Sequence, residues 1–429
     1  MAIGKNKTFQ KNDHREINKK LKFFHFSENV GSSLPIWLPN GELVKHLIKQ
    51  YLKKLETEYN FNFVTTPVLG KIEMYKTSGH LEHYQEYMFP AIKVNEQKLM
   101  LRPMACPHHC KVFCHQNYSY QDLPVRMSEN VLLFRYEKSG AIHGLERVRQ
   151  MELKDAHIFL PKNKSIIKKE ITNCFFMIKT ALRKLGLKID KIYLSLHDSE
   201  NMKKYYHDIN LWKKTENILE EVLTELKVTF EKVKGEAAFY GPKIDFQVNT
   251  VLQHDVTIST IQLDFLLGEK FKLKYRTKKQ NKGEIFATPI VVHLGTIGTY
   301  ERLLSLLLEQ KNGWLPFWLS PAQIMIFSMN NDETAKKYAQ KVFEFLKSHD
   351  LRVEMMDVNK KISENIKLAW ERKVPVHIFL GKQETESKTI TYIHHNHPQT
   401  KHNKDIFQLI DQCQKWMNNI ESEKNKKQK

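Results

Sequence analysis

The pattern of apolar residues changes at Trp318-Leu319-Ser320-Pro321, and this change divides the chain into two parts. After it, predicted strands at 323–329, 351–358 and 375–381 alternate with predicted helices at 333–346 and 362–373. Strands that alternate with helices are typical of a small α/β domain with a largely parallel sheet. The C-terminal part is therefore expected to be such a domain.

The N-terminal part is strand-rich, with helices inserted between the strands. Apolar residues recur at helical spacing in some segments and alternate or run together in others. The predicted helices are 42–59, 165–185 and 210–226, and the predicted strands are 61–68, 191–196, 243–248 and 259–265. Pro67 ends the first of these strands, and proline is an ordinary strand terminator.

A strand at 133–137 (LFRYE) is followed by a loop and by the returning segment RVRQMELKDAH. Alternate residues of a strand share one face. If the returning segment is one strand, its shared face carries Arg147, Arg149, Met151, Leu153, Asp155 and His157. Arginines, an aspartate and a histidine together are difficult to explain as a core, so this face is predicted to be a wall of an active site.

A third segment joins a buried strand to a helix. The near-continuous apolar run TPIVVHL predicts a buried strand with His293 near its end. Gly295 and Gly298 permit tight turns, and Thr299 is predicted to cap a helix whose packed side carries leucines. Arg302 falls in the first turn of this helix, so its charge is expected to point back toward the end of the strand.

Taken together, these segments resemble the class II aminoacyl-tRNA synthetases. The resemblance rests on FRYE before RVR, on GTYER at the start of a leucine-rich helix, and on the contexts MACPHH, KDAH and VVHL. Within this class the threonyl-tRNA synthetases are most similar, from about Asp13 to the C-terminal region. The resemblance implies an α/β (α+β) fold: an antiparallel-sheet catalytic domain at 13–319 and an anticodon-binding α/β domain at 320–420. Residues 1–12 and 421–429 are expected to be a basic tip and a basic tail.

The resemblance implies a threonine–tRNA ligase that activates L-threonine with ATP and Mg²⁺ and transfers it to the 3′ end of tRNA(Thr). It also implies a homodimer whose interface contains helix 42–59 and the strand that follows. The chain begins almost directly at the catalytic part, so we expect no N-terminal editing region. Two alternatives stay open: an inactive synthetase-like protein that binds RNA or regulates, and a relative that charges proline or serine.

The matching positions receive roles from the family. Arg135 would grip the amino-acid carboxylate and the α-phosphate, and Arg302 would hold the phosphates from the opposite side. Glu137 would lie near the adenine amino group, Arg147 on the γ-phosphate and Met151 against the adenine ring.

The metal and the amino acid have their own matched positions. The family's zinc, one per subunit, would be bound by Cys106, His157 and His293, which leaves a fourth position for substrate. Asp155 would accept hydrogen bonds from the threonine hydroxyl or ammonium group. The remaining matches are Tyr240, Lys243 and Gln262 in the pocket, and His80 for transfer to the tRNA ribose.

A rival metal set consists of Cys106, Cys110 and Cys114, which are spaced to lie along one helix face. One straight helix rarely supplies three ligands to one ion, so we interpret Cys110 and Cys114 as packing residues. The sequence also departs from the family at Gln150, Leu153, Lys154, Thr257 and Leu294.

Composition limits the partners and the compartment. The 68 basic residues against 48 acidic ones give a formal charge of +20, which favours a polyanionic partner but also fits a merely well-solvated surface. No apolar run is long enough to span a bilayer, and the basic N-terminus lacks the apolar centre of a signal peptide. Five cysteines without a disulfide-like framework suggest a reducing compartment, so we expect a cytoplasmic protein.

Overall fold

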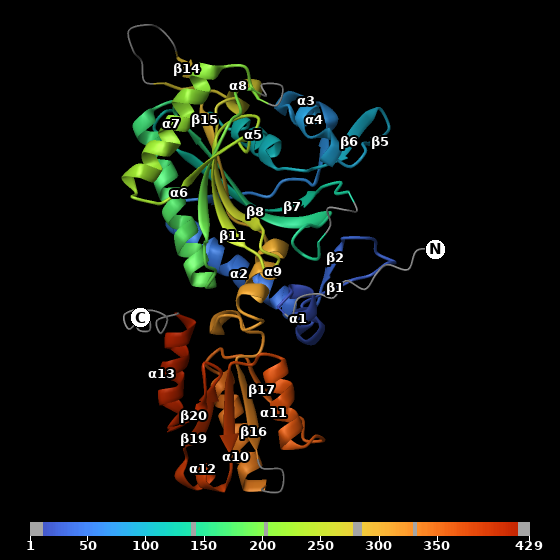
Figure 1. Ribbon diagram of the computed structural model, residues 1–429, viewed down its shortest axis with the longest axis vertical. Helices are drawn as coiled ribbons and strands as arrows, with labels where there is room; N and C mark the ends of the chain where they lie inside the picture. The colour runs from blue at the N-terminus through green and yellow to red at the C-terminus, as the bar shows by residue number, and fades with distance from the viewer. Residues whose placement is uncertain (1–11, 139–142, 201–204, 278–284, 329–332, 419–429) are drawn as a thin grey trace.

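The structure, a computed structural model, describes residues 12–138, 143–200, 205–277, 285–328 and 333–418. The predicted tail and almost all of the predicted tip therefore lie outside the described residues, as do residues 139–142 of the loop after strand 133–137. Two folded parts lie one above the other in Figure 1, with the C-terminal part below.

The N-terminal part is organised around an eight-stranded sheet with the order β10-β9-β11-β12-β15-β8-β7-β3. The four pairings from β11 to β7 are antiparallel, and only the two edge pairings, β10 with β9 and β3 with β7, are parallel. The strands are β3 Asn62–Phe63, β7 Val125–Phe134, β8 Gln150–Leu160, β9 Lys191–Leu196, β10 Glu231–Lys234, β11 Lys243–Asn249, β12 Asp255–Asp264 and β15 Ile290–Thr299. The antiparallel sheet implied by the resemblance is confirmed.

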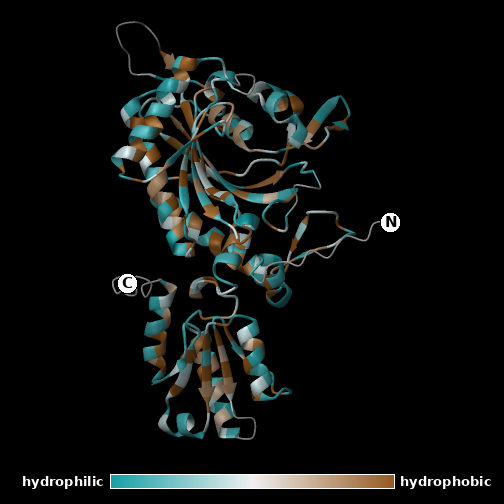
Figure 2. Ribbon diagram, viewed as in Figure 1, coloured by the Kyte–Doolittle hydropathy of each residue, from teal (hydrophilic) through white to brown (hydrophobic). Residues whose placement is uncertain are grey.

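Helices cover one face of this sheet and leave the other free for a site. On β8, Ala156, Ile158 and Leu160 point into a core that they share with α6 (Lys164–Leu185). In Figure 2 the central strands and the helices beside them carry many brown, hydrophobic residues. The intervening residues of β8 point to the opposite face, as a two-residue strand period requires.

The predicted helices agree with the structure, and two strand predictions do not. Helices α2 (Pro39–Glu58), α6 and α7 (Ile209–Glu225) match the predicted segments. The strand predicted at 61–68 is wrong beyond Phe63, because buried side chains take the backbone groups that a strand would pair. The Thr66 N–H donates to Glu129 at 3.1 Å, and Arg102 donates to the Thr66 carbonyl at 3.1 Å.

The strand predicted at 133–137 ends at Phe134, and the returning segment is a strand only from Gln150. The N–H groups of Tyr136 and Arg149 donate to the carbonyls of Tyr87 and Ser33 instead of pairing in the sheet.

The third segment folds nearly as expected. Thr299 caps α9 (Tyr300–Gln310) by accepting the Arg302 N–H, and Leu303 and Leu304 are buried. Gly298 has φ +62° and a Cβ there would lie 2.6 Å from the Ile258 carbonyl oxygen, so the turn requires glycine. The turn predicted at Gly295 is wrong, because this residue stays in the strand opposite Asp155.

The C-terminal part contains a five-stranded sheet with the order β17-β16-β18-β19-β20. The three predicted strands, β16 (Ile324–Ser328), β17 (Val353–Met355) and β18 (Val376–Leu380), pair in parallel, as predicted. Two further strands, β19 (Ile390–His394) and β20 (His397–Lys404), extend the sheet in an antiparallel direction. The polar, histidine-rich sequence of β20 did not indicate a strand.

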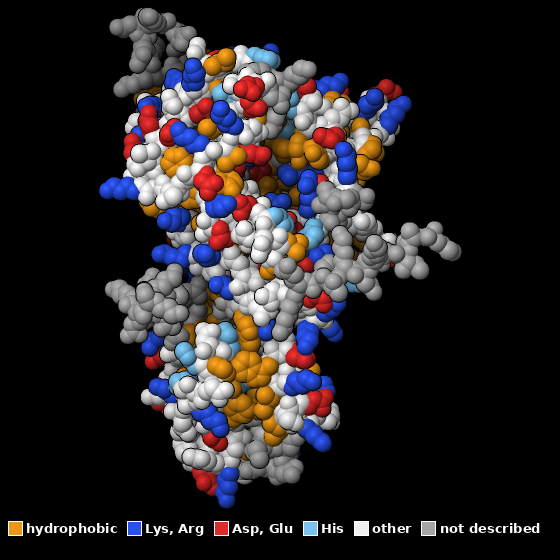
Figure 3. Space-filling model, viewed as in Figure 1, with side chains coloured by type: hydrophobic (Ala, Val, Ile, Leu, Met, Phe, Trp, Pro, Cys, Tyr) orange, Lys and Arg blue, Asp and Glu red, His pale blue; other side chains and the backbone are white. Residues whose placement is uncertain are grey.

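The surface and the helices agree with the composition. Lysine and arginine side chains occur over both the upper and the lower parts of the face shown in Figure 3. Within the described ranges, no helix combines the length and the apolar character needed to cross a membrane.

Candidate active site

A cavity of about 340 Å³ opens on the free face of the central sheet. Its walls come from β8, β11, β12 and β15, from the start of α9, from Cys106 and from the loop that follows β7. Twelve of the thirteen predicted site residues line it: Cys106, Arg135, Glu137, Arg147, Met151, Asp155, His157, Tyr240, Lys243, Gln262, His293 and Arg302. The exception is His80, described below.

Three possible metal ligands meet at one end of the cavity, which we call the donor end. Cys106 begins α5 (Cys106–Cys114), whereas His157 and His293 are directly opposite each other on neighbouring strands β8 and β15. Their ligand atoms all lie within 4.8 Å of one another, and His157 Nε2 is 2.9 Å from His293 Nδ1. A thiol and two imidazoles at this spacing could hold a transition metal.

The outer nitrogens of both histidines have buried partners. His157 Nδ1 lies 2.8 Å from His109 Nδ1, and His109 Nε2 lies 3.1 Å from Glu129. His293 Nε2 lies 2.9 Å from Asp264 Oδ2. Such partners fix the ring orientation of metal-binding histidines. Nothing in the sequence had marked His109, Glu129 or Asp264 as site residues.

Burial controls the charge of the donor end. Burial, with the nearby Asp155 and Asp264 charges, raises the pKa of the Cys106 thiol, and burial lowers the pKa of His157. Burial disfavours ionisation of Glu129, but hydrogen bonds from His109 and Thr66 outweigh it and lower its pKa to about 2. The site therefore holds a neutral thiol and a neutral His157 beside anchored carboxylates, and a bound cation would favour the thiolate.

The rival cysteine set does not form. Cys110 is buried in an apolar cluster with Phe113, as predicted, and its sulfur is not among the ligand atoms that meet at the donor end. Cys114 is exposed, so its interpretation as a packing residue is wrong.

The wall beside the donor end is polar and ordered by side-chain contacts. The Tyr240 hydroxyl donates to Gln262 Oε1, and the Tyr240 ring stacks on His293 with a centroid distance of 4.9 Å. Asp155 is buried, and burial raises its pKa. Lys243 forms an ion pair of 3.0 Å with Asp245, which also lines the cavity and was not predicted from the sequence.

Three arginines line the other end of the cavity, which we call the arginine end. Arg302 donates to the backbone carbonyls of Glu146 (3.2 Å) and Thr257 (2.9 Å). Arg135 donates to the Pro103 carbonyl at 3.4 Å, and its guanidinium lies 5.7 Å from the centre of the Tyr84 ring.

The third arginine is paired with an acid. Arg147 Nε donates to Glu137 Oε2 at 2.8 Å, and Arg147 is 44% exposed whereas Glu137 is nearly buried. These cations and the backbone at this end could bind a polyphosphate.

His80 lies behind the donor end and does not line the cavity. Its Nδ1 is 2.7 Å from Ser78 Oγ, and its Nε2 is 3.7 Å from Cys106 Sγ. Burial, with the positive charges nearby, lowers the pKa of His80 to about 3. In this conformation the ring is therefore a neutral neighbour of the possible ligand thiol.

Four of the five positions that depart from the family have visible local roles. Lys154 points away from the cavity and forms a buried ion pair of 2.7 Å with Glu56 of α2. Leu294 is fully buried in the core beneath the sheet. Leu153 and Thr257 line the cavity, and the Thr257 hydroxyl also contacts Gln247.

Comparisons with known proteins give one consistent result. Residues 87–311 match the family model described as the tRNA synthetase class II core domain (G, H, P, S and T). Residues 323–416 match an anticodon binding domain.

Three similar proteins are named as threonine–tRNA ligases or threonyl-tRNA synthetases. A threonine–tRNA ligase of Ureaplasma parvum is 43% identical over 89% of this chain, and the match spans 64% of that relative's length. The corresponding protein of Mycoplasma genitalium is also 43% identical, over 90% of this chain and 67% of its own length. A solved RNA binding domain of threonyl-tRNA synthetase from Cryptosporidium parvum matches 94% of this chain and 98% of its own, with a TM-score of 0.85 and 31% identity.

Proposed function

The chain belongs to the class II tRNA synthetases, and on that premise we propose that it is a threonine–tRNA ligase. It would join L-threonine to ATP to form threonyl-adenylate and then transfer threonine to the 3′ end of tRNA(Thr). We also propose the division into a catalytic domain at 13–319 and an anticodon-binding domain at 320–420. The observation that carries the proposal is a single cavity with a cysteine–histidine cluster at one end and three arginines at the other.

We propose that the donor end holds one zinc ion per chain. The fit rests on the donors themselves: one sulfur and two imidazole nitrogens converge, and the outer nitrogen of each imidazole is already engaged. A set of three protein ligands is typical of zinc sites that keep one position open. Zinc bound there would supply a Lewis acid for the amino and hydroxyl groups of threonine.

The protein's own groups then complete amino-acid selection. Asp155 faces the cavity beside His157 and would accept a hydrogen bond from the hydroxyl or the ammonium group. Tyr240 and Gln262 close the same wall. Valine has the shape of threonine without its hydroxyl, and a site built for a polar group rejects such an isostere strongly.

The arginine end would bind ATP, with Mg²⁺ accompanying the phosphates. Two anions, the threonine carboxylate and the α-phosphate, must approach each other during activation. Arg135 and Arg302 line the cavity from different elements and would neutralise the charge that develops between them. Arg147 would turn from Glu137 to the γ-phosphate, which would leave Glu137 free for the adenine amino group, with Met151 against the ring.

Binding of tRNA would use both parts of the chain. The net charge of +20 favours a polyanion, and the anticodon-binding part supplies the second contact. We propose that His80 assists transfer to the terminal ribose, which requires the ring to reach the cavity from its present place beside Cys106.

We propose a homodimer in the assembled enzyme. Four large apolar side chains that lie in or after the expected interface segments 42–59 and 61–68 are exposed, namely Phe63 at 41%, Leu69 at 37%, Ile92 at 48% and Val94 at 45%. Leu69 and Ile92 belong to one small sheet, β4-β6-β5 (Leu69–Lys71, Gln97–Leu101 and Ile92–Val94). Light scattering should give the dimer mass at micromolar concentration, and an active monomer would overturn this assembly.

ATP–pyrophosphate exchange measured with each of the twenty amino acids tests the proposal. Exchange that depends on threonine, followed by charging of tRNA(Thr), is the expected result. Exchange that depends on proline or serine alone would replace the substrate. No exchange with any amino acid, from a protein that still binds RNA, would favour the inactive alternative.

A further inference from the structure

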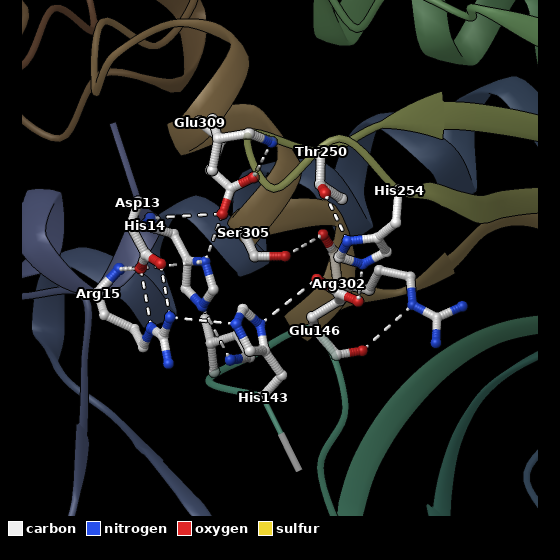
Figure 4. Close-up of polar contacts among 12 residues, drawn as sticks. Asp13, His14, Arg15, His143, Glu146, Thr250, His254, Arg302, Ser305 and Glu309 are labelled. Carbon is white, nitrogen blue, oxygen red and sulfur yellow. Dashed lines mark hydrogen bonds and ion pairs between the residues drawn. The ribbon is translucent and has the colours of Figure 1, made fainter. Parts of the chain in front are cut away.

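Four segments far apart in the sequence meet behind the arginine end (Figure 4). They are α1 (His14–Leu21), the loop 143–147, the turn 250–254 and the helix α9. Side chains at the meeting point are buried, His14 completely and Glu309 to 7% exposure. Neither His14 nor Glu309 lines the cavity, so their burial calls for a separate explanation.

His14 joins the loop to α9 through both of its ring nitrogens. The Leu145 backbone N–H donates to His14 Nε2 at 3.2 Å, so this nitrogen carries no proton. His14 Nδ1 must then carry the proton, and it donates to Glu309 Oε1 at 2.7 Å. The two partners therefore fix one neutral tautomer of the ring.

The loop is shaped to accept this ring. Gly144 has φ +50°, and a Cβ at this position would lie 2.2 Å from His14 Nε2. Both the backbone conformation and the close approach of His14 therefore require glycine. The Leu145 hydrogen bond and the close approach at Gly144 therefore both place His14 Nε2 against this loop.

A second contact ties the same loop to the start of α1. Arg15 forms two hydrogen bonds with Asp13, at 2.9 and 2.6 Å, and also reaches His143 Nε2 at 3.1 Å. Because a guanidinium group only donates, His143 Nε2 accepts and Nδ1 carries the proton. That Nδ1 lies 3.5 Å from a carboxylate oxygen of Glu146.

Glu146 is the point at which this network reaches the cavity. Its side chain lies 2.9 Å from His254 Nε2, and its backbone carbonyl accepts from Arg302 Nε at 3.2 Å. Burial disfavours its ionisation, but the contacts with His143 and His254 outweigh burial and lower the pKa of Glu146 to about 2. A fixed carboxylate thus holds the residue whose carbonyl orients Arg302.

Helix α9 connects the two ends of this network, because it carries both Arg302 and Glu309. Arg302 and Glu309 are seven residues apart, so two helical turns place them on one side of this helix. Glu309 Oε2 accepts the Val251 N–H at 3.3 Å, which adds the turn 250–254 to the same assembly.

We propose that His14, with Gly144 and Glu309, positions the ATP-binding arginines Arg147 and Arg302 by holding the loop 143–147 against α9. The proposal rests on the proposed function, because it assigns a nucleotide role to the arginine end. In this arrangement the N-terminal helix α1 acts on the nucleotide site without touching it. The three are positioning residues, and they act through Leu145 and Glu146.

The group formed by Asp13, His14 and Glu309 is not a further metal site. Asp13, His14 and Glu309 offer ligand atoms within 4.8 Å of one another. Both carboxylates, however, already accept N–H groups, Asp13 from Arg15 and Glu309 from His14 and Val251. An ion would have to displace these donors.

Two substitutions of His14 separate its two contacts in the full-length protein. In His14→Asn the amide can still donate to Glu309 from the place of Nδ1, but it is too short to reach Leu145. In His14→Gln the longer side chain can still accept the Leu145 N–H through its carbonyl oxygen. Gly144→Ala disturbs the loop with α1 unchanged, and His349→Ala, in the C-terminal part, serves as the control.

The first readout is amide hydrogen exchange at Leu145, which requires no activity. We expect exchange roughly tenfold faster or more in His14→Asn and Gly144→Ala, because a lost hydrogen bond lowers the local opening free energy. His14→Gln should retain most of the protection, and His349→Ala all of it. Equal protection in the wild type, His14→Asn and Gly144→Ala would overturn the proposal.

The second readout is the KM for ATP and for threonine in pyrophosphate exchange. We expect the KM for ATP to rise roughly tenfold in His14→Asn, the effect of losing one buried hydrogen bond. The KM for threonine should stay within about twofold, because threonine binds at the other end. A parallel rise of both constants would indicate general loss of structure and contradict the proposal.

Failure of this proposal can be distinguished from failure of the proposed ligase function. If the wild type shows no threonine-dependent exchange, the proposed function fails. Binding of a non-hydrolysable ATP analogue by calorimetry, together with Leu145 exchange, then still decides whether His14 positions the arginine end. Unchanged analogue affinity in both His14→Asn and Gly144→Ala would overturn the proposal.

Discussion

Side chains hold the two histidines at the donor end of the cavity, whereas backbone carbonyls hold Arg135 and Arg302 at the arginine end. His157 and His293 contact His109 and Asp264 through their outer nitrogens. Arg302, by contrast, donates to the carbonyls of Glu146 and Thr257. The donor end should therefore respond to the chemistry of neighbouring side chains, and the arginine end to the position of its loops.

The largest expected effect is loss of metal at the donor end. Cys106→Ala removes the only sulfur donor of the cluster, so the zinc content should fall from about one per chain to a small fraction. Threonine-dependent exchange should be abolished. His157→Ala and His293→Ala should behave alike.

Cys110→Ala is the matched control, since it removes a buried thiol one helical turn away that makes no contribution to the cluster. It should retain the metal, as measured by elemental analysis. Full metal content in all three ligand variants would contradict the assignment. Loss in Cys110→Ala and Cys106→Ala, with full metal content in His157→Ala and His293→Ala, would favour the cysteine set.

At the arginine end we expect a smaller loss with the fold intact. Arg302→Ala and Arg135→Ala should each slow adenylate formation by roughly a hundredfold or more, the scale for removal of one preorganised charge donor. The zinc content should not change, because neither residue contacts the cluster. Single-turnover kinetics and circular dichroism measure the two expectations.

Arg372→Ala provides the control for these variants. Arg372 forms a surface ion pair with Glu354 in the C-terminal part, far from the cavity. It should leave adenylate formation unchanged. Near-normal rates in both Arg302→Ala and Arg135→Ala would instead support the inactive alternative.

The sequence predicted some parts of the site and not others. The apolar runs predicted the strands that carry His157 and His293, but no periodicity reveals that β8 and β15 are neighbours across 136 residues of chain. Only the resemblance brought them together. The resemblance placed the residues that would touch substrate and gave no information about His109, Asp264 or His14, which touch other protein groups.

Failures in the fold have a similar cause. The segment at 61–68 alternates like a strand, but Arg102 and Glu129 take the backbone groups of Thr66, and both come from distant elements. A local pattern cannot anticipate such competition. His109 did carry a signal: it follows Cys106 by three residues and lies one helical turn beyond it on buried α5.

Amino-acid discrimination should be uneven at the donor end. Serine keeps both groups that a zinc ion could bind and differs from threonine by one methyl group, which is worth only roughly tenfold to two-hundredfold. Valine lacks the hydroxyl and should be rejected by roughly ten-thousandfold or more. Exchange rates with the three amino acids measure this, and valine activation that exceeds serine activation would contradict a metal-based pocket.

The smallest expected effect concerns a side chain that no substrate would touch. Asp264 Oδ2 lies 2.9 Å from His293 Nε2, which leaves Nδ1 facing the other donors, while Oδ1 accepts the N–H groups of Leu266 and Leu267. Asp264→Asn can keep the contacts of Oδ1 but turns an NH₂ group toward His293. Nε2 would then have to accept, and the proton would move to Nδ1, where it blocks metal binding.

Loss of such a partner typically weakens metal affinity by about tenfold to a hundredfold, so we expect that range from competition with a chelator. Asp245→Asn is the matched control, because Asp245 also lines the cavity but pairs with Lys243 and contacts no ligand histidine. If both variants bind zinc as the wild type does, side-chain contacts do not determine the zinc affinity of the donor end, and the contrast between the two ends is wrong. If only Asp264→Asn weakens binding while Arg302→Ala leaves it unchanged, each end is controlled by its own support.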